Sequence, residues 1–142
     1  MSIQNRSLSL SAFLRRAFLA DAMGSTAVGM LLALDHGALA PMLGLSAPFL
    51  LGVGLITLPF AMAVGWMSSR QRLPRWAIWA VVLSNALWAL QSAVLLIGGW
   101  VHPTGPGQAF VIGQAIWAAV FADLEWFGMA RRSSEQSYLA TA

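Results

Sequence analysis

The sequence predicts an all-α protein: a bundle of four transmembrane helices running up, down, up and down, with both termini in the cytoplasm. Of the 142 residues, 58% are hydrophobic and only 9% are charged. The mean hydropathy of +0.71 is too apolar for a soluble domain of this length. Four apolar segments each have a length close to the roughly 20 residues that a helix needs to cross a bilayer. The basic residues, all of them arginines, gather on one side of this topology.

The four expected spans are residues 17–34, 48–67, 76–97 and 108–130, which together form a single membrane domain. The connections between them read DHGALAPMLGLSA, SSRQRLPR and GGWVHPTGPG. Each contains Gly, Pro or Ser residues that end helices. Because the connections are short, consecutive helices are expected to run antiparallel.

Arginines mark the cytoplasmic side of a membrane protein. They precede the first span, lie in the second connection and follow the fourth span: Arg6, Arg15 and Arg16; Arg70, Arg72 and Arg75; Arg131 and Arg132. This pattern predicts a multi-pass protein of the inner (plasma) membrane with N- and C-termini in the cytoplasm. The segment RRAFLA also resembles a twin-arginine export signal, but Asp21 interrupts its apolar core. We therefore interpret the arginine pair as a cytoplasmic anchor.

Asp21 is the first residue of functional interest, because a carboxylate at mid-membrane costs about 2.5 to 3.5 kcal/mol on insertion scales. Arg15 and Arg16 lie six and five residues before it and thus on other faces of the helix. Asp21 is therefore expected to pair with a group on another helix, to contact water, or to be protonated. Ser25 shares its face, as do Gly29, Leu32 and His36, so this stripe is expected to face the bundle.

The third span carries a polar face in the segment SNALWALQS, which contains Asn85, Trp88 and Gln91. Asn85 lies near mid-membrane, where an amide needs a hydrogen-bond partner from another helix. In the fourth span Gln114 and Glu125 share a face, whereas Asp123 points away from Gln114. We expect a buried polar group that either only hydrogen-bonds the helices to one another or also binds a proton or substrate, with these candidate members: Asp21, Ser25, Asn85, Trp88, Gln91, Gln114 and Glu125.

Two structural roles are also expected. The first is an ionic layer that links Asp21 and Glu125 to arginines at the cytoplasmic side, formed by Arg70, Arg72, Arg75, Asp123, Arg131 and Arg132. The second is close helix packing through small residues, namely Gly29, Ala33, Gly54, Ala61 and Gly65.

Several chemical classes have no support in the sequence. Cysteine is absent, which excludes thiol catalysis and Cys-ligated metal centres. The arginines form no dense basic patch, so nucleic acid is not an expected partner. The metal-ligand candidates are Asp35, His36 and His102, but no ligand spacing supports a site. We therefore expect no cofactor, assign no catalytic residue and do not expect an enzyme.

The chain resembles small, mostly uncharacterised four-helix proteins of bacterial inner membranes, through the early acid of its first span, NALWALQS and GQAIWAAV. In the first span, Asp21, Gly24, Ser25 and Thr26 are similar to the Glu, Gly and Thr pattern of small multidrug resistance exporters, with Asp in place of Glu. The second resemblance covers only this local pattern.

Three functions therefore remain open. The first is an oligomerising or accessory subunit, which associates with itself or with a larger membrane complex through its small-residue faces. The second is a small proton-linked transporter or channel that uses Asp21 and Glu125. The third is a cofactor-binding membrane protein or enzyme that uses His36 and His102.

Overall fold

The computed structural model describes the backbone of residues 7–141 and the side chains of residues 8–131. In this part of the chain, four helices dominate: α1 (Ala12–Leu43), α2 (Ala47–Ser68), α3 (Arg75–Ile97) and α4 (Gly105–Thr141). Each helix is long and apolar enough to cross a membrane. Each expected span lies inside one of these helices, so the prediction of four apolar helices is confirmed.

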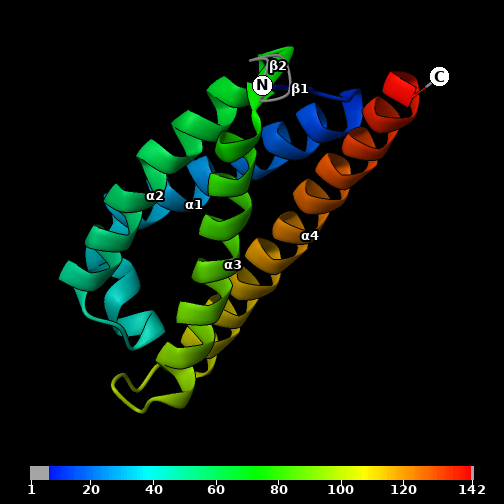
Figure 1. Ribbon diagram of the computed structural model, residues 1–142. Helices are drawn as coiled ribbons and strands as arrows, with labels where there is room; N and C mark the ends of the chain where they lie inside the picture. The colour runs from blue at the N-terminus through cyan, green and yellow to red at the C-terminus, as the bar shows by residue number, and fades with distance from the viewer. Residues whose placement is uncertain (1–6, 142) are drawn as a thin grey trace.

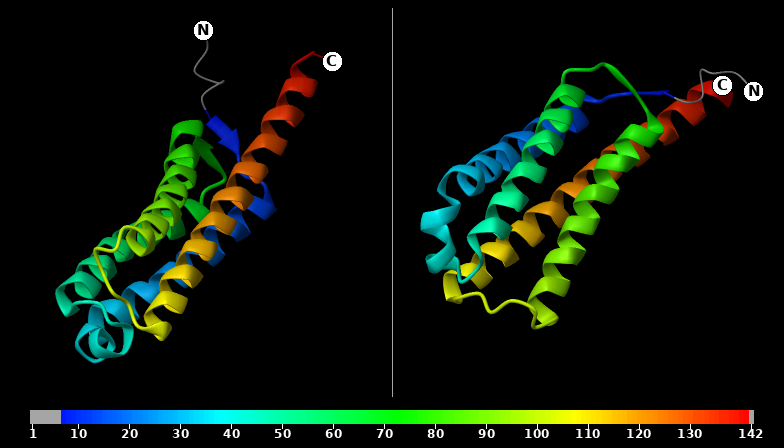
Figure 2. Two further views of the ribbon diagram at one scale, coloured as in Figure 1. Left: turned by 90° about the horizontal axis from the view of Figure 1, so that it is seen from below. Right: turned by 90° about the vertical axis from the view of Figure 1, so that its left-hand side faces the viewer.

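The helices form two hairpins, α1 with α2 and α3 with α4, and α1 also packs against α4. Figure 1 shows the α1–α2 and α3–α4 connections at one end of the bundle. The start of α1, the α2–α3 connection and the last turns of α4 lie at the other end. The turned views in Figure 2 show the same division.

Two short strands are an addition that the sequence did not predict. β1 (Ser7–Ser9) pairs antiparallel with β2 (Arg72–Pro74), with Leu8 opposite Leu73. Both leucines are buried in the apolar cluster at this end of the bundle. The backbone N–H of Leu10 donates to the carbonyl of Gln71 at 2.8 Å. The N-terminal segment is thus tied to the α2–α3 connection.

Helix α1 extends beyond the expected span at both ends. It begins after Ser11, whose hydroxyl accepts a hydrogen bond from the N–H of Leu14 at 3.1 Å, as an N-cap does. The helix leaves helical geometry at Asp35 and then continues to Leu43. It ends at Gly44, whose φ of 66° is the left-handed conformation that glycine adopts most readily.

Small residues bring α1 and α2 together. A Cβ atom at Gly54 would lie 2.7 Å from the backbone nitrogen of Ala33 and 2.8 Å from the carbonyl oxygen of Gly29. Gly65 faces Ala22 in the same seam. Without a strong hydrophobic drive between helices in lipid, such close backbone contact supplies much of the packing energy. The small residues of these faces therefore pack within one chain.

Apolar clusters occupy the two ends of the bundle. One includes Leu14, Phe18, Val64 and Ile78 beside the strands, and the other includes Leu32, Leu50 and Val111 near the opposite connections. Asn85 of α3 and Glu125 of α4 are buried polar residues that lie between these clusters along their helices, and the buried Asp21 of α1 lies next to Ala22 at the inner edge of the first cluster. The fold thus holds its polar site between two apolar layers.

Candidate functional site

Three buried polar side chains from three helices meet at the centre of the bundle. Asp21 of α1 and Glu125 of α4 are each 0% exposed, and Asn85 of α3 is 5% exposed. The amide Nδ2 of Asn85 donates to Oδ2 of Asp21 at 3.0 Å and to Oε2 of Glu125 at 3.3 Å. One amide therefore joins both carboxyl groups, and we call these residues the Asp21–Asn85–Glu125 cluster.

The second oxygen of Asp21 accepts two further hydrogen bonds. Ser25, one turn along α1, donates from Oγ to Oδ1 at 3.2 Å. Trp117 of α4 donates from Nε1 to the same oxygen at 3.4 Å. A Cβ atom at Gly24 would lie 2.9 Å from Cε2 of Trp117, so the glycine makes room for the indole. Both oxygens of Asp21 are thus held by donors from its own and neighbouring helices.

Glu125 is less completely satisfied. Its Oε1 atom is buried and has no hydrogen-bond partner among the described residues. In the described part of the chain, its one hydrogen-bond donor is Asn85, and no arginine forms an ion pair with it or with Asp21. Two carboxyl groups therefore share one neutral donor in an apolar interior.

The expected ionic layer is not formed by the described side chains. Arg70 lies 4.2 Å above the ring of Trp66, and Arg131 lies 4.4 Å above that of Phe127. Arg72, Arg75 and Asp123 are exposed, and the side chain of Arg132 lies outside the described residues. Asp21 and Glu125 therefore have no arginine partner among the described residues, and the ionic layer stays a prediction. The depth of the two acids explains this, because the arginines stay at the end of the bundle and Asn85 lies between the acids.

A cavity of about 590 Å³ adjoins the cluster. All four helices line it, and Ser25, Asn85 and Trp117 belong both to its wall and to the hydrogen bonds of Asp21. Most of the wall is apolar, with four aromatic side chains: Phe60, Trp88, Phe110 and Trp117. A volume of this size, with a few polar groups on an apolar wall, is typical of small-molecule sites.

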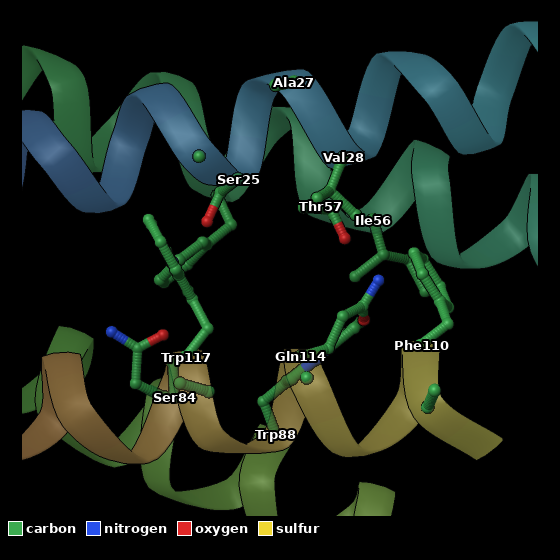
Figure 3. Close-up of a pocket in the computed structure, with 16 residues that line it drawn as sticks. Ser25, Ala27, Val28, Ile56, Thr57, Ser84, Trp88, Phe110, Gln114 and Trp117 are labelled. Atoms are coloured by element: carbon green, nitrogen blue, oxygen red, sulfur yellow. The ribbon is translucent and has the colours of Figure 1, made fainter. Parts of the chain in front are cut away.

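The polar groups of the cavity wall are all uncharged. Besides Ser25 and Asn85 they are Thr57, Ser84 and Gln114. Figure 3 shows Gln114 and Trp117 rising from α4 into the cavity, with Thr57 and Ser25 on the opposite side. The Nε2 atom of Gln114 is buried and has no hydrogen-bond partner among the described residues. Gln114 therefore adds an amide to the few polar groups of a mostly apolar wall.

Of the seven residues predicted for the polar group, six are brought together. Asp21, Asn85 and Glu125 form the cluster, and Ser25, Trp88 and Gln114 line the cavity beside it. Gln91 is exposed and does not line the cavity. The angular estimate on α3 included it because it lies close to Trp88 on the helical wheel, but the cavity lies nearer the middle of the helix.

The metal-ligand candidates form no cluster in the described part of the chain. No group of three or more metal-binding side chains occurs there. Nδ1 of His36 lies 3.1 Å from the carbonyl oxygen of Ala33, in its own helix, and His102 is exposed in the α3–α4 connection. Asp35 lies at the break in α1.

Trp117 is the site residue that the sequence interpretation missed. Trp117, Phe121 and Glu125 follow one another at intervals of four residues, which places them on one face of α4. The rings of Trp117 and Phe121 lie 4.8 Å apart. This spacing from Glu125 is the signal that could have assigned Trp117 to the polar site.

Comparisons with protein-family models, with curated proteins and with solved structures found no match.

Proposed function

We propose that this chain is a small proton-linked transporter of the inner membrane, in which the Asp21–Asn85–Glu125 cluster binds the proton and the adjoining cavity binds the solute. In this proposal the helices run up, down, up and down, with both termini in the cytoplasm. The arginine distribution supports that orientation. Pairing of β1 with β2 also supports it, because paired strands must lie on the same side of a membrane.

The observation that carries the proposal is the shared amide of Asn85. Two ionised carboxylates joined only through one neutral donor would place two adjacent negative charges in an apolar interior, which is electrostatically costly. A bound proton removes one of these charges. If Glu125 binds the proton, its carboxyl group becomes a hydroxyl donor. If the proton is bound elsewhere in the cluster, the free Oε1 atom of Glu125 stays an acceptor for a proton passing through the bundle.

The cluster and the cavity share residues, and this supports coupling between proton and solute. Ser25, Asn85 and Trp117 donate to Asp21 and also line the cavity. A solute that moves any of these side chains changes the hydrogen bonds of Asp21. Solute binding and proton binding would then alter one another's affinity by the same factor, as thermodynamic linkage requires.

Association with a second copy or with a larger membrane complex stays a prediction. The small residues expected to support it, including Gly29, Gly54 and Gly65, pack between α1 and α2 of the same chain. That packing favours the transporter over the accessory subunit, because these faces are already occupied.

Infrared spectroscopy of the purified protein tests the proton site directly. We expect the wild-type protein at neutral pH to show the carbonyl stretch of a protonated carboxylic acid, shifted in deuterated water. Asp21→Asn and Glu125→Gln should remove or displace this band. Asp123→Asn is the matched control, since Asp123 is an exposed acid two residues from Glu125. The proton site is refuted if the wild-type protein lacks the band. It is also refuted if both cluster variants keep the band unchanged from wild type.

Proteoliposomes test the transport step. A pH-sensitive dye trapped inside them should report proton movement that depends on an added solute in wild type and in Asp123→Asn. The movement should be absent in Asp21→Asn and in Glu125→Gln. Circular dichroism and size-exclusion profiles that match wild type would show that these variants are folded.

A further inference from the structure

We propose that the α1–α2 hairpin binds one anionic phospholipid, whose phosphate contacts Arg15 and Arg70 and whose acyl chain fills a groove between the two helices. This inference goes beyond the proposed transport function and does not depend on it. Three observations carry it: the way the two arginines are held, the local lack of acidic residues, and an apolar groove that leads to the arginines.

Arg15 is held at the end of the seam between α1 and α2. Its Nε atom donates to the carbonyl oxygen of Ser68, the last residue of α2, at 2.9 Å. This bond uses one of the five N–H donors of the guanidinium group and leaves four on the two Nη atoms. The side chain is exposed, so a ligand at the surface of the bundle can reach these donors. A guanidinium group held in this way suits a phosphate, which accepts two parallel hydrogen bonds from it.

Arg70 lies two residues beyond Ser68, in the α2–α3 connection at the strand-bearing end of the bundle (Figure 1). Its guanidinium group lies 4.2 Å above the ring of Trp66, and both side chains are exposed. Stacking on the indole covers one face of the group, while its N–H donors lie along its edge. Residues 47–75 contain no acidic residue. The positive charge of Arg70 is therefore not neutralised by any side chain of α2 or of this connection.

A shallow apolar groove of about 430 Å³ leads to the two arginines. Residues of α1 and α2 line it, and none of them is charged. On α1, Arg15 lies seven residues before Ala22 and eleven before Thr26, which is about two and three helical turns. On α2, Ser68 lies seven residues after Ala61. Arg15 and Ser68 therefore continue the two faces that line the groove, and their hydrogen bond closes its end.

The groove and the arginines together fit a phospholipid. Because the groove lies on two helices that are apolar enough to span a membrane, an acyl chain of the bilayer is the molecule that fills it. Contacts with the groove would be lost if it stayed empty. The headgroup of the same lipid would lie at the end of the hairpin, beside the arginines. Basic residues between transmembrane helices favour anionic headgroups at the cytoplasmic side.

Native mass spectrometry of the purified wild-type protein tests the class of lipid. The probes are phosphatidylglycerol and phosphatidylcholine with the same oleoyl chains; both contain a phosphate, but only phosphatidylglycerol has a net negative charge. We expect the protein to bind phosphatidylglycerol at roughly fivefold lower concentration or less. Equal binding of the two lipids would overturn the proposal. Displacement of phosphatidylglycerol by glycerol 3-phosphate, which has no acyl chain, would show that the arginines bind a free anion and would also overturn it.

Arg15→Gln and Arg70→Gln should each weaken the binding of phosphatidylglycerol by roughly fivefold and leave that of phosphatidylcholine unchanged. Arg131→Gln is the matched control, since Arg131 is also exposed and lies 4.4 Å above an aromatic ring, but belongs to α4. An equal loss in all three variants would mean that any surface arginine attracts the lipid, and the assigned site would be wrong. If Arg15→Gln does not fold, Arg70→Gln and the wild-type comparison still decide the proposal.

Thr26→Phe tests the groove, because the new ring would occupy it at a distance of about three helical turns from Arg15. Binding of phosphatidylglycerol should fall in this variant. It should not fall in Ala20→Phe, because Ala20 is exposed on the same helix but does not line the groove. Circular dichroism that matches wild type would show that both variants are folded. Unchanged binding in a folded Thr26→Phe variant would contradict the position of the acyl chain, and the competition with glycerol 3-phosphate tests the need for a chain without any substitution.

Discussion

Replacing Asn85 with leucine should destabilise the bundle, because it removes the donor that joins two buried acids. The amide makes one bond of 3.0 Å to Asp21 and one of 3.3 Å to Glu125. Interhelical hydrogen bonds in membrane proteins average about 0.6 kcal/mol and reach about 1.7 kcal/mol. Two such bonds give an expected loss of roughly 1 to 3 kcal/mol in the free energy of unfolding.

Unfolding in mixed micelles with increasing sodium dodecyl sulfate measures this loss, and circular dichroism follows the helices. Gln91→Leu makes the same kind of polar-to-apolar change on an exposed face of the same helix. It should change the unfolding free energy by no more than about 0.5 kcal/mol. An equal effect of the two substitutions would refute the role assigned to the Asn85 amide.

A double-mutant cycle with Asp21→Ala separates the hydrogen bond from general loss of packing. If the bond exists, the effects of Asn85→Leu and Asp21→Ala should be non-additive by about 0.5 kcal/mol or more. Strict additivity would mean that the two side chains do not interact, and the cluster would have to be abandoned.

The packing and capping of the helices give two further predictions, both measured by the same unfolding assay. Gly54→Ala should lower the free energy of unfolding by about 1 to 3 kcal/mol through overpacking, because its Cβ would lie 2.7 Å from the backbone nitrogen of Ala33. Gly52→Ala is the control and should be close to neutral, because a Cβ there meets nothing within 4 Å. Equal effects of the two substitutions would contradict the backbone contact. Thr104→Val should lower the free energy of unfolding by about 0.5 to 2 kcal/mol. The Thr104 hydroxyl accepts from the N–H of Gly107 in the first turn of α4, and it donates to the carbonyl of Met42 at the end of α1. Ser46→Ala is its control, since Ser46 precedes α2 without a side-chain capping bond, and an effect as large as that of Thr104→Val would rule out the cap.

Hydropathy and helical spacing predicted most of the fold and the membership of the site. Long apolar segments have one stable form in a bilayer, and for this reason the four helices could be assigned from composition and length. The angular relation between Gln114 and Glu125 predicted a shared face of α4; in the structure Glu125 is buried, Gln114 is half-buried and Asp123 is exposed. The stripe through Ser25 and Gly29 was likewise expected to face the bundle.

Distances between helices could not be predicted in the same way. Spacing along a helix gives the face on which a residue lies but not which neighbouring helix meets that face. Arginine was therefore the expected partner of Asp21, because opposite charges attract, whereas the packing places the amide of Asn85 there. The strand pair was missed because each strand has three residues, too few for an alternating pattern to be recognised.

The β1–β2 pair imposes an order on the biogenesis of the protein. Residues 7–9 are synthesised before α1 and α2, but their partners, residues 72–74, follow both helices. In the proposed topology the pair can close only after the first hairpin has completed its return across the bilayer. A chain in which one of these helices failed to insert would leave the two strands on opposite sides. In that topology, a closed strand pair requires that both ends of the first hairpin lie on the same side of the bilayer.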